Sequence, residues 1–510
     1  MNEHTVGIGA LSFDDVIAVA RHGAAIRIDP LSTTEMTASR RIIEELASDS
    51  RPHYGVSTGF GALATTSIPT DQRALLQRSL VRSHAASSGA EVEQEVIRAL
   101  MLLRLSTLAT GRTGVRPEVA HTYASMLNAA ITPIVGEYGS LGCSGDLAPL
   151  SHCALAAMGE GHVRDRNGVA KPAAQALEEA GIAHVELREK EGLALINGTD
   201  GMLGMLVLAI ADIELLLDTA DLAAAMSVEG LAGNDAVFAD DLQSLRPQVG
   251  QRRSAKAIHD ALQGSPVIAA HRATGFTRVQ DAYSLRCAPQ VHGGARDTVD
   301  HARVVAEREL ASAVDNPVIT LDGRVESNGN FHGAPLGYVL DFLAIVVADV
   351  ASMSERRTDR MLDANRSGGL PPFLAADPGV DSGHMIAHYT QASIVSELKR
   401  LASPASVDSI PTSAMQEDHV SMGWGAARKL RRSVDGLRRV IAIEILTAAR
   451  AIELRGEGAA PVTGSAISAV REYVDGAAHD RFLAPEIEAV VQLVASGRLF
   501  RESSPTQPDW

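Results

Sequence analysis

The sequence has 510 residues, enough to bury a sizeable core, and its 62 acidic residues outnumber the 46 basic ones, for a formal net charge of −16. This balance argues against the basic face that nucleic acids and anionic membranes require, so neither is expected as a partner. Hydrophobic residues make up 45% of the chain and aromatic residues only 4%, which indicates an aliphatic core of closely packed helices and excludes general disorder.

The cysteines and the chain's apolar runs indicate a cytoplasmic setting. Cys143, Cys153 and Cys287 are too few and too far apart for a disulfide framework, and none has the paired spacing of metal ligands. The first residues lack the basic start and apolar run of a secretory signal, and the apolar runs after Gly201 and Leu336 are broken by acidic residues. We therefore expect a soluble intracellular protein without a metal ion or a membrane-spanning segment.

Helices dominate the predicted elements. Residues 91 to 110 predict an amphipathic helix that ends near Gly111, with an apolar stripe formed by Val92, Val96, Leu100 and Leu103. Residues 201 to 232 and 334 to 353 are apolar on nearly all sides, which is typical of central helices in a large bundle. Residues 426 to 455 predict another long helix, with apolar residues spaced three or four apart at Leu430, Val434, Leu437, Ile441 and Ile445.

Strand signals are sparse. Asn167-Gly168 and Asp322-Gly323 each lie between short segments and predict small hairpins. We find no repeat and no low-complexity linker, so the regions we distinguish form one continuous unit. They are 1–200, which carries many of the candidate site residues, 201–460, a central helical bundle, and 461–510, a helical region with a polar tail from about Glu502.

The most unusual segment is GSLGCSGDLAPL at 139 to 150. By pattern alone it is a turn that enters a helix, with Asp146 as N-cap and Pro149 in the first turn. It lacks the lysine of a phosphate-binding loop, and Ser144 lacks the G-x-S-x-G spacing of a hydrolase nucleophile. Local pattern therefore leaves its chemistry open.

The same segment resembles the signature of the histidine and aromatic amino acid ammonia-lyase family. In that family an Ala-Ser-Gly triplet cyclises to an electrophilic 4-methylidene-imidazol-5-one, and the triplet here is Cys143-Ser144-Gly145, with Cys in place of Ala. Further segments match in the family's order along nearly the whole chain: YGVSTGFG at 54–61, RSHAAS at 82–87, GLALINGT at 192–199, QDAYSLRCAPQVHG at 280–293, DNP at 315–317, NGNFHG at 328–333 and PTSAMQEDHVSMG at 411–423.

The resemblance implies a fold and an assembly. The fold is mostly α, a long central helical bundle of the aspartase and fumarase superfamily with a few short hairpins. The assembly is a homotetramer whose active sites combine residues from more than one subunit. The apolar helices at 201–232 and 334–353 suit such packing between subunits.

The resemblance also implies a chemistry. Removing ammonia from an amino acid needs an electrophile that ordinary side chains do not supply. In such an enzyme the ring made from Cys143, Ser144 and Gly145 provides it without an external cofactor. The amide nitrogen of Gly145 closes onto the carbonyl of residue 143, and Ser144 then loses water. The thiol of Cys143 is a substituent on the ring and takes no part in closing it.

Further residues take roles by the same resemblance. Tyr54 is the base that removes the β-proton, within a glycine-rich loop suited to opening and closing over a substrate. Asn197 and Tyr283 lie beside the electrophile and the substrate amine, and Arg286 binds the substrate carboxylate with its planar fork. Phe331 and Gln416 are carried over as pocket residues. Taken alone, each would more often be a structural residue, Tyr54 as a loop anchor.

Two residues indicate the substrate. His84 stands where phenylalanine enzymes of the family place apolar residues, and the Ala85 that follows resembles histidine rather than tyrosine enzymes. Glu397 stands where the aromatic enzymes tend to carry an amide, and a carboxylate there can accept an imidazole N–H. On sequence alone Glu397 could equally be a solvated helix carboxylate. Together the two residues favour deamination of L-histidine to urocanate and ammonia.

Alternatives remain at this stage. A tyrosine or phenylalanine lyase, or an aminomutase, would use the same ring. A non-catalytic helical scaffold is disfavoured because the residues assigned to catalysis are all present. The cluster Gln416-Glu417-Asp418-His419 could be taken for a metal site, but adjacent residues do not share a helix face and no H-x-x-x-H spacing supports zinc. Two departures from the family's pattern, Ser57 and Asp200, have no evident consequence from sequence.

Overall fold

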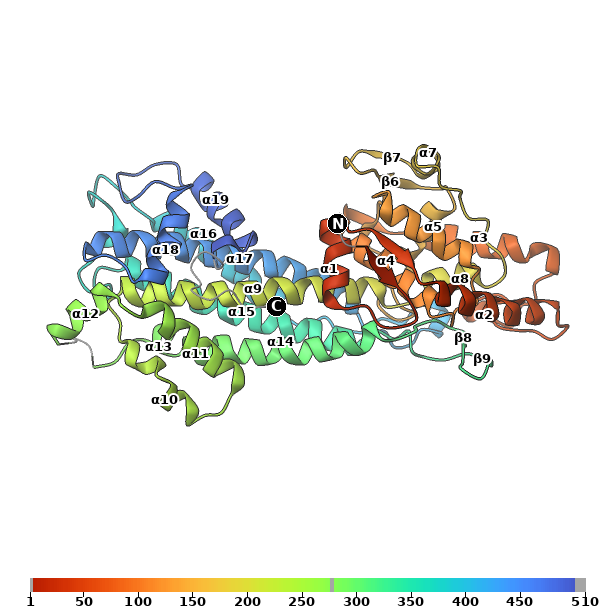
Figure 1. The fold of residues 1–510 in the computed structure, drawn as a ribbon, viewed down its shortest axis with the longest axis horizontal. Helices are drawn as coiled ribbons and strands as arrows, with labels where there is room; N and C mark the ends of the chain where they lie inside the picture. Colours follow the sequence, from red (N-terminus) through yellow and green to blue (C-terminus); the bar gives the residue numbers. More distant parts are fainter. Residues whose placement is uncertain (1–2, 276–278, 500–510) are drawn as a thin grey trace. The chain divides into compact units, whose positions relative to one another are not determined.

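The computed structural model describes residues 3–275 and 279–499, and the polar tail predicted from Glu502 lies outside them (Figure 1). The chain forms two compact units. Unit 1 consists of the residues up to Leu208, Arg303–Asp341 and Pro404–Arg428, and unit 2 of Ala209–Ala302, Phe342–Ser403 and the residues from Lys429 on. The three-part division expected from the sequence stays a prediction.

Unit 1 combines short helices with small sheets. Its helices are α1 (Phe13–His22), α2 (Pro30–Ser48), α3 (Arg73–His84), α4 (Gln94–Ala109), α5 (Pro117–Asn128), α6 (Leu147–Ala157), α7 (Ala173–Glu179) and α8 (Glu191–Ile196), with 3-10 turns η1 (Gly61–Leu63), η2 (Thr70–Gln72) and η5 (Ser413–Met415). Its strands are β1 (His4–Val6), β2 (Ile26–Ile28), β3 (Ser88–Glu91), β4 (Thr132–Pro133), β5 (Gly136–Tyr138), β6 (His162–Arg164), β7 (Ala170–Pro172), β8 (Val318–Ile319) and β9 (Val325–Glu326).

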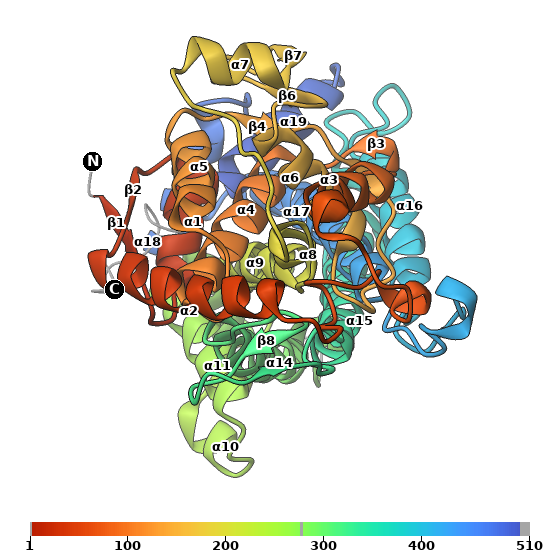
Figure 2. The same cartoon turned by 90° about the vertical axis from the view of Figure 1, so that its right-hand side faces the viewer.

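The small sheets have simple pairings. Strands β1 and β2 pair in parallel, while β3–β5, β4–β6, β6–β7 and β8–β9 are antiparallel. The hairpins predicted at Asn167-Gly168 and Asp322-Gly323 are confirmed as the turns of β6–β7 and β8–β9, with both glycines at positive φ. Figure 2 shows β6, β7 and α7 lying together.

Four long helices cross the division between the units: α9 (Asp200–Gly230), α14 (Ala288–Leu310), α15 (Ala334–Leu362) and α17 (Gly423–Arg455). The three predicted long helices are thereby confirmed, although α15 continues nine residues beyond the predicted end. The apolar positions predicted for α17 are all buried, from Leu430 to Ile445. Of the helices in the described residues, α15 alone has the length and composition to span a membrane, and 61% of its most apolar window is buried, as in a core helix.

The remaining helices belong to unit 2: α10 (Asp240–Ser244), α11 (Val249–Leu262), α12 (Pro266–Ala273), α13 (Tyr283–Arg286), α16 (Met385–Leu401), α18 (Pro461–Arg471) and α19 (Ala484–Ala495), with 3-10 turns η3 (Asp235–Phe238) and η4 (Pro372–Leu374). Buried polar groups tie this unit together. Arg357 and Glu444 form a fully buried ion pair. Glu444 also accepts from the Ser227 hydroxyl, and Arg357 donates to the carbonyl of Ser284 in α13.

The prediction that 91–110 is amphipathic is wrong in one respect. The helix is α4, with Gly111 at positive φ just beyond its end, but it is buried on nearly all sides from Val96 to Ala109. An amphipathic helix would turn its two arginines toward solvent. Arg98 instead donates to the carbonyls of Val19 and Leu127, and Arg104 is completely enclosed, because backbone carbonyls and a carboxylate satisfy them in the interior.

Candidate active site

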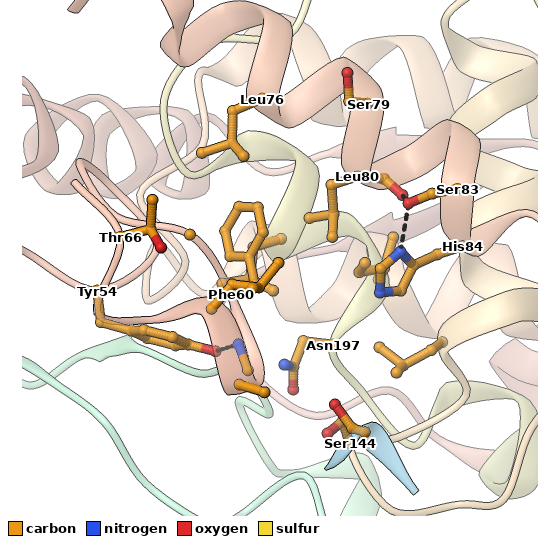
Figure 3. Close-up of a pocket in the computed structure, with 18 of the residues that line it drawn as sticks. Tyr54, Phe60, Thr66, Leu76, Ser79, Leu80, Ser83, His84, Ser144 and Asn197 are labelled. Atoms are coloured by element: carbon orange, nitrogen blue, oxygen red, sulfur yellow. Dashed lines mark hydrogen bonds between the residues drawn. The ribbon is translucent and has the colours of Figure 1, made fainter. Parts of the chain in front are cut away.

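Unit 1 contains a cavity of about 560 Å³ whose walls come from segments far apart in the sequence (Figure 3). The walls are formed by the loop 54–68, by α3, by the turn that enters α6, by α8 and by the segment 413–417. Of the residues predicted from sequence, Tyr54, His84, Ser144 and Asn197 line this cavity. Figure 3 shows the side chains of Tyr54, Asn197 and Ser144 directed toward the same end of it.

The turn that carries the triplet is anchored at both ends. The carbonyl of Gly142 accepts hydrogen bonds from the amide of Gly333 (2.9 Å) and the hydroxyl of Ser421 (2.7 Å). At the other end, Asp146 begins α6 as predicted, but its side chain does not cap that helix. Its carboxylate accepts instead from the amides of Gly201 and Met202, both 2.9 Å, in the first turn of α9.

Glu417 lies against the triplet and was missed by the sequence analysis. Its Oε1 accepts from the Ser144 hydroxyl at 3.0 Å, and its Oε2 accepts from the Cys143 thiol at 3.4 Å and the Thr412 hydroxyl at 2.8 Å. The segment 411–423 matches the family's pattern, so a carboxylate within it, such as Glu417, was a candidate site residue. Gln416, which was chosen there, is exposed and is not among the described residues that line the cavity.

Burial sets the protonation of the neighbouring groups. Burial, reinforced by the charge of Glu417, raises the pKa of the Cys143 thiol to about 12, so the thiol stays protonated and is a poor nucleophile. Burial lowers the pKa of His84, which favours the neutral imidazole, and its Nδ1 lies 3.0 Å from the Ser83 hydroxyl. Burial raises the pKa of Asp146 to about 7.

The hydroxyl of Tyr54 is held by the chain itself. The amide of Gly61 donates to it at 3.3 Å, so the glycine-rich loop folds back over the ring. Gly55, at positive φ, packs on Leu193 and Pro317, where a Cβ would lie 2.9 Å from Leu193 Cδ2. Tyr54 is therefore a loop anchor whose hydroxyl nevertheless reaches the cavity.

Asn197 lines the cavity and has a buried polar atom without a partner among the described residues. The residue follows α8 and is only 4% exposed, yet among the described residues its Oδ1 has no hydrogen-bond partner. Buried amide oxygens are normally paired, so this unpaired oxygen beside the cavity can accept a hydrogen bond from a ligand. Phe331 lies half-buried in the turn before α15 and is not among the described residues that line the cavity.

Three predicted residues, Tyr283, Arg286 and Glu397, belong to unit 2. Tyr283 and Arg286 form the two ends of the short helix α13 and share a face, as their spacing predicts. The guanidinium of Arg286 lies 4.7 Å from the centre of the Tyr283 ring and donates to the carbonyl of Asp281. Tyr283 is 70% exposed, and Glu397 on α16 is exposed and paired with Arg400.

No group of three or more His, Cys, Asp or Glu side chains among residues 3–275 and 279–499 is arranged to hold a metal ion. The polar groups of the cavity are instead a phenol, a primary amide, a carboxylate, an imidazole and hydroxyls. These can bind an amine and move protons.

Comparison with known proteins gives a consistent result. The family model described as aromatic amino acid lyase matches residues 11–473. A histidine ammonia-lyase of Streptomyces avermitilis is 61% identical over 98% of both chains. Among solved structures, a tyrosine aminomutase of Streptomyces globisporus is similar at 35% identity, with a TM-score of 0.94 over 99% of this chain and 100% of that one. The histidine ammonia-lyase of Trypanosoma cruzi is similar at 37% identity, with a TM-score of 0.91 over 100% and 96%.

Proposed function

This chain belongs to the aromatic amino acid lyase family, and we propose that it is a histidine ammonia-lyase, which converts L-histidine without oxidation to trans-urocanate and ammonia, the first step of histidine degradation. The observation that carries the proposal is the convergence of Tyr54, Ser144 and Asn197 on one end of the cavity, where the Asn197 amide oxygen has no partner among the described residues. The 61% identity to a histidine ammonia-lyase supports the choice of substrate.

The residues at 142–146 fit the self-formed 4-methylidene-imidazol-5-one. A Cβ at Gly145 would lie 2.1 Å from the carbonyl oxygen of Gly198, so only glycine can stand there, and its amide nitrogen is the least hindered for ring closure. The ring would form from Cys143, Ser144 and Gly145, and no external cofactor is needed. It supplies an electrophilic alkene carbon that activates the substrate amine as a leaving group.

The protein's own residues then bind the substrate and move its protons. Tyr54 removes the β-proton, and the Gly61 amide stabilises the negative charge on its oxygen. Asn197 accepts a hydrogen bond from the substrate amine. Glu417 loses its Ser144 donor once that hydroxyl has left as water, so Oε1 becomes free to accept a second N–H from the amine.

By resemblance, residues of unit 2 also take roles in the reaction. Arg286 binds the substrate carboxylate and Tyr283 assists beside the electrophile, while Phe331 and Gln416 remain proposed pocket residues from unit 1. In the proposed homotetramer, residues from more than one subunit form each site. The large exposed side chains on α15, Tyr338, Phe342 and Ile345, support burial of this helix between subunits.

Substrate choice is assigned to His84 and Glu397. The neutral His84 ring uses Nδ1 with Ser83, so Nε2 can hydrogen-bond a substrate imidazole in the cavity. Glu397 would accept the second imidazole N–H. The proposed partner is a small-molecule amino acid substrate and not nucleic acid or a membrane, and the proposed location is the cytoplasm.

A tyrosine aminomutase is the second candidate, because the backbone matches one with a TM-score of 0.94. The 35% identity to that protein is well below the 61% identity to a histidine ammonia-lyase, so we place it second. Glu397→Gln separates the two candidates: a histidine enzyme should lose activity, whereas an aromatic enzyme should change little.

The test of the electrophile is Ser144→Ala. We expect loss of urocanate formation from L-histidine, followed by the ultraviolet absorbance of the conjugated product, with the fold retained by circular dichroism. Ser125→Ala, on α5 away from the cavity, is the matched control. Undiminished activity of Ser144→Ala would show that the triplet is not the electrophile.

A further inference from the structure

The last residue of the triplet rests directly on another stretch of backbone. A Cβ on Gly145 would lie 2.1, 2.4 and 2.6 Å from the carbonyl oxygen, carbonyl carbon and nitrogen of Gly198. The amide of Asp146 donates to the same Gly198 carbonyl at 2.7 Å. No side chain therefore separates the Gly145 backbone from the Gly198 backbone, and the Asp146 hydrogen bond links the two segments.

The opposite side of Gly198 is closed by an ion pair. A Cβ on Gly198 would lie 1.7 Å from Nη2 of Arg104 and 2.3 Å from Oδ2 of Asp200. Gly198 therefore lies between the triplet and the Arg104–Asp200 pair, in contact with both. Both side chains of the pair are almost wholly buried, with exposures of 0% and 6%.

All three nitrogens of the Arg104 guanidinium donate hydrogen bonds. Its Nε and Nη2 donate to Asp200 at 3.1 and 2.5 Å. Its Nη1 donates to the carbonyls of Ala194 (2.9 Å) and Asn197 (3.2 Å), and Nη2 also reaches the carbonyl of Val314 at 3.3 Å. A planar guanidinium has five donors in a fixed fork, and this one uses them to fix the backbone from 194 to 200.

The geometry points to a role in making the electrophile: we propose that the Arg104–Asp200 ion pair acts as a positioning pair for ring closure, by holding Gly198 against Gly145. Hydrogen bonds already fix the turn at Gly142 and Asp146, and contact with Gly198 restrains it at Gly145. Holding two reacting groups in place removes entropy that a flexible tripeptide would lose on cyclising. The inference rests on the proposed function only in that the triplet must cyclise.

The reaction that the pair assists is balanced by the loss of two waters. The nitrogen of Gly145 bonds to the carbonyl carbon of Cys143, and that oxygen leaves as water with the hydrogens of the Gly145 and Ser144 amides. The Cα hydrogen and the hydroxyl of Ser144 then leave as the second water, which forms the exocyclic alkene. No oxidant, reductant or other reactant is needed.

The test is the intact mass of purified full-length variants together with their thermal unfolding. Asp200→Asn keeps the shape of the side chain but removes its charge, and Arg104→Lys keeps the charge but loses the fork. In folded protein we expect the fraction of chains that have lost two waters to fall by roughly threefold or more, because the reacting groups are less well held. Asp200→Glu, which restores the charge, should recover part of that fraction.

Glu309→Gln is the matched control. Glu309 is a half-buried carboxyl whose Oε1 accepts from the Thr199 hydroxyl, next to Asp200. None of its atoms is among the three that lie nearest to a Cβ built on Gly198. It should mature like the wild type. Wild-type protein that loses no water would refute the proposed function itself, whatever the variants do.

Two results would overturn the role of the ion pair. One is complete loss of two waters in folded Asp200→Asn and Arg104→Lys. The other is absence of folded protein for both variants and for Asp200→Glu, because the pair would then serve folding rather than ring closure.

Discussion

Asp146 provides a test of how burial controls a carboxyl group at the heart of unit 1. The side chain is completely buried and accepts from Ser140 Oγ at 2.8 Å and from the amides of Gly201 and Met202. Burial raises its pKa from 3.8 to about 7 despite these donors. In Asp146→Asn the amide oxygen can keep both backbone donors and the Ser140 hydroxyl can turn to accept, so the main change is the loss of ionisation.

The sign and size of the effect follow from linkage. A carboxyl whose folded-state pKa is raised contributes stability that is complete below pH 3.8 and is lost as the pH rises to about 7. Between pH 5 and pH 8 the wild type should lose about 3 kcal/mol from this group, at about 1.4 kcal/mol for each pH unit below 7. Asparagine cannot ionise, so Asp146→Asn should gain about 3 kcal/mol relative to the wild type over that interval.

The assay is urea unfolding followed by far-ultraviolet circular dichroism at pH 5 and pH 8, at one protein concentration. Asp322→Asn is the control, because Arg324 lowers the pKa of that exposed carboxyl to about 2 and it is ionised at both pH values in the folded and unfolded states. The free energy of unfolding of Asp322→Asn should differ from that of the wild type by the same amount at pH 5 and pH 8. If the difference in unfolding free energy between Asp146→Asn and the wild type is also independent of pH, or falls as the pH rises, then burial does not raise the pKa of Asp146.

Three further variants test other parts of the structure. Glu417→Gln should lower kcat/KM for L-histidine by about 10- to 100-fold, the worth of one charge-assisted hydrogen bond, and unchanged steady-state kinetics would remove Glu417 from the site. Cys143→Ala should still lose two waters by intact mass, because the thiol takes no part in closure; an unmatured mass would contradict this. Arg357→Met should lower the free energy of unfolding by about 3 to 5 kcal/mol, because Glu444 is left buried and unpaired. Adding Glu444→Leu should recover most of that loss in denaturant titrations.

The long helices and hairpins could be predicted because their signals are local. Segments that are apolar on nearly all sides predict α9 and α15, apolar residues spaced three or four apart predict α17, and Asn167-Gly168 and Asp322-Gly323 predict the two hairpin turns. The burial of α4 could not be predicted, because its arginines are satisfied by carbonyls distant in the chain. Arg98 depends on Val19 and Leu127, and no pattern within 91–110 reports them.

The site was predicted where residues matched a family motif and missed where a contact is long-range. Tyr54, His84, Ser144 and Asn197 were chosen by motif, and the fold brings them to one cavity. Glu417 was passed over because adjacent residues on a helix face different ways. The segment is not a helix there: Ser413, Ala414 and Met415 have positive φ, and the tight turn directs Glu417 to Ser144.

Asp146 shows the same limit. Its position before α6 was readable from sequence, but the helix that its carboxylate caps is α9, which begins 54 residues later at Asp200. The choice between capping the nearer and the farther helix depends on tertiary packing. A single sequence therefore identifies the capping residue but not the helix that it caps.

In the proposed function, the chain deaminates L-histidine through an electrophile made from its own residues. The most direct test is to incubate the purified enzyme separately with L-histidine, L-tyrosine and L-phenylalanine and follow the ultraviolet absorbance of each conjugated acrylate. A histidine ammonia-lyase should give product from L-histidine alone. Product from L-tyrosine or L-phenylalanine but not from L-histidine would contradict the roles given to His84 and Glu397, and no product from any of the three would contradict the proposed lyase activity.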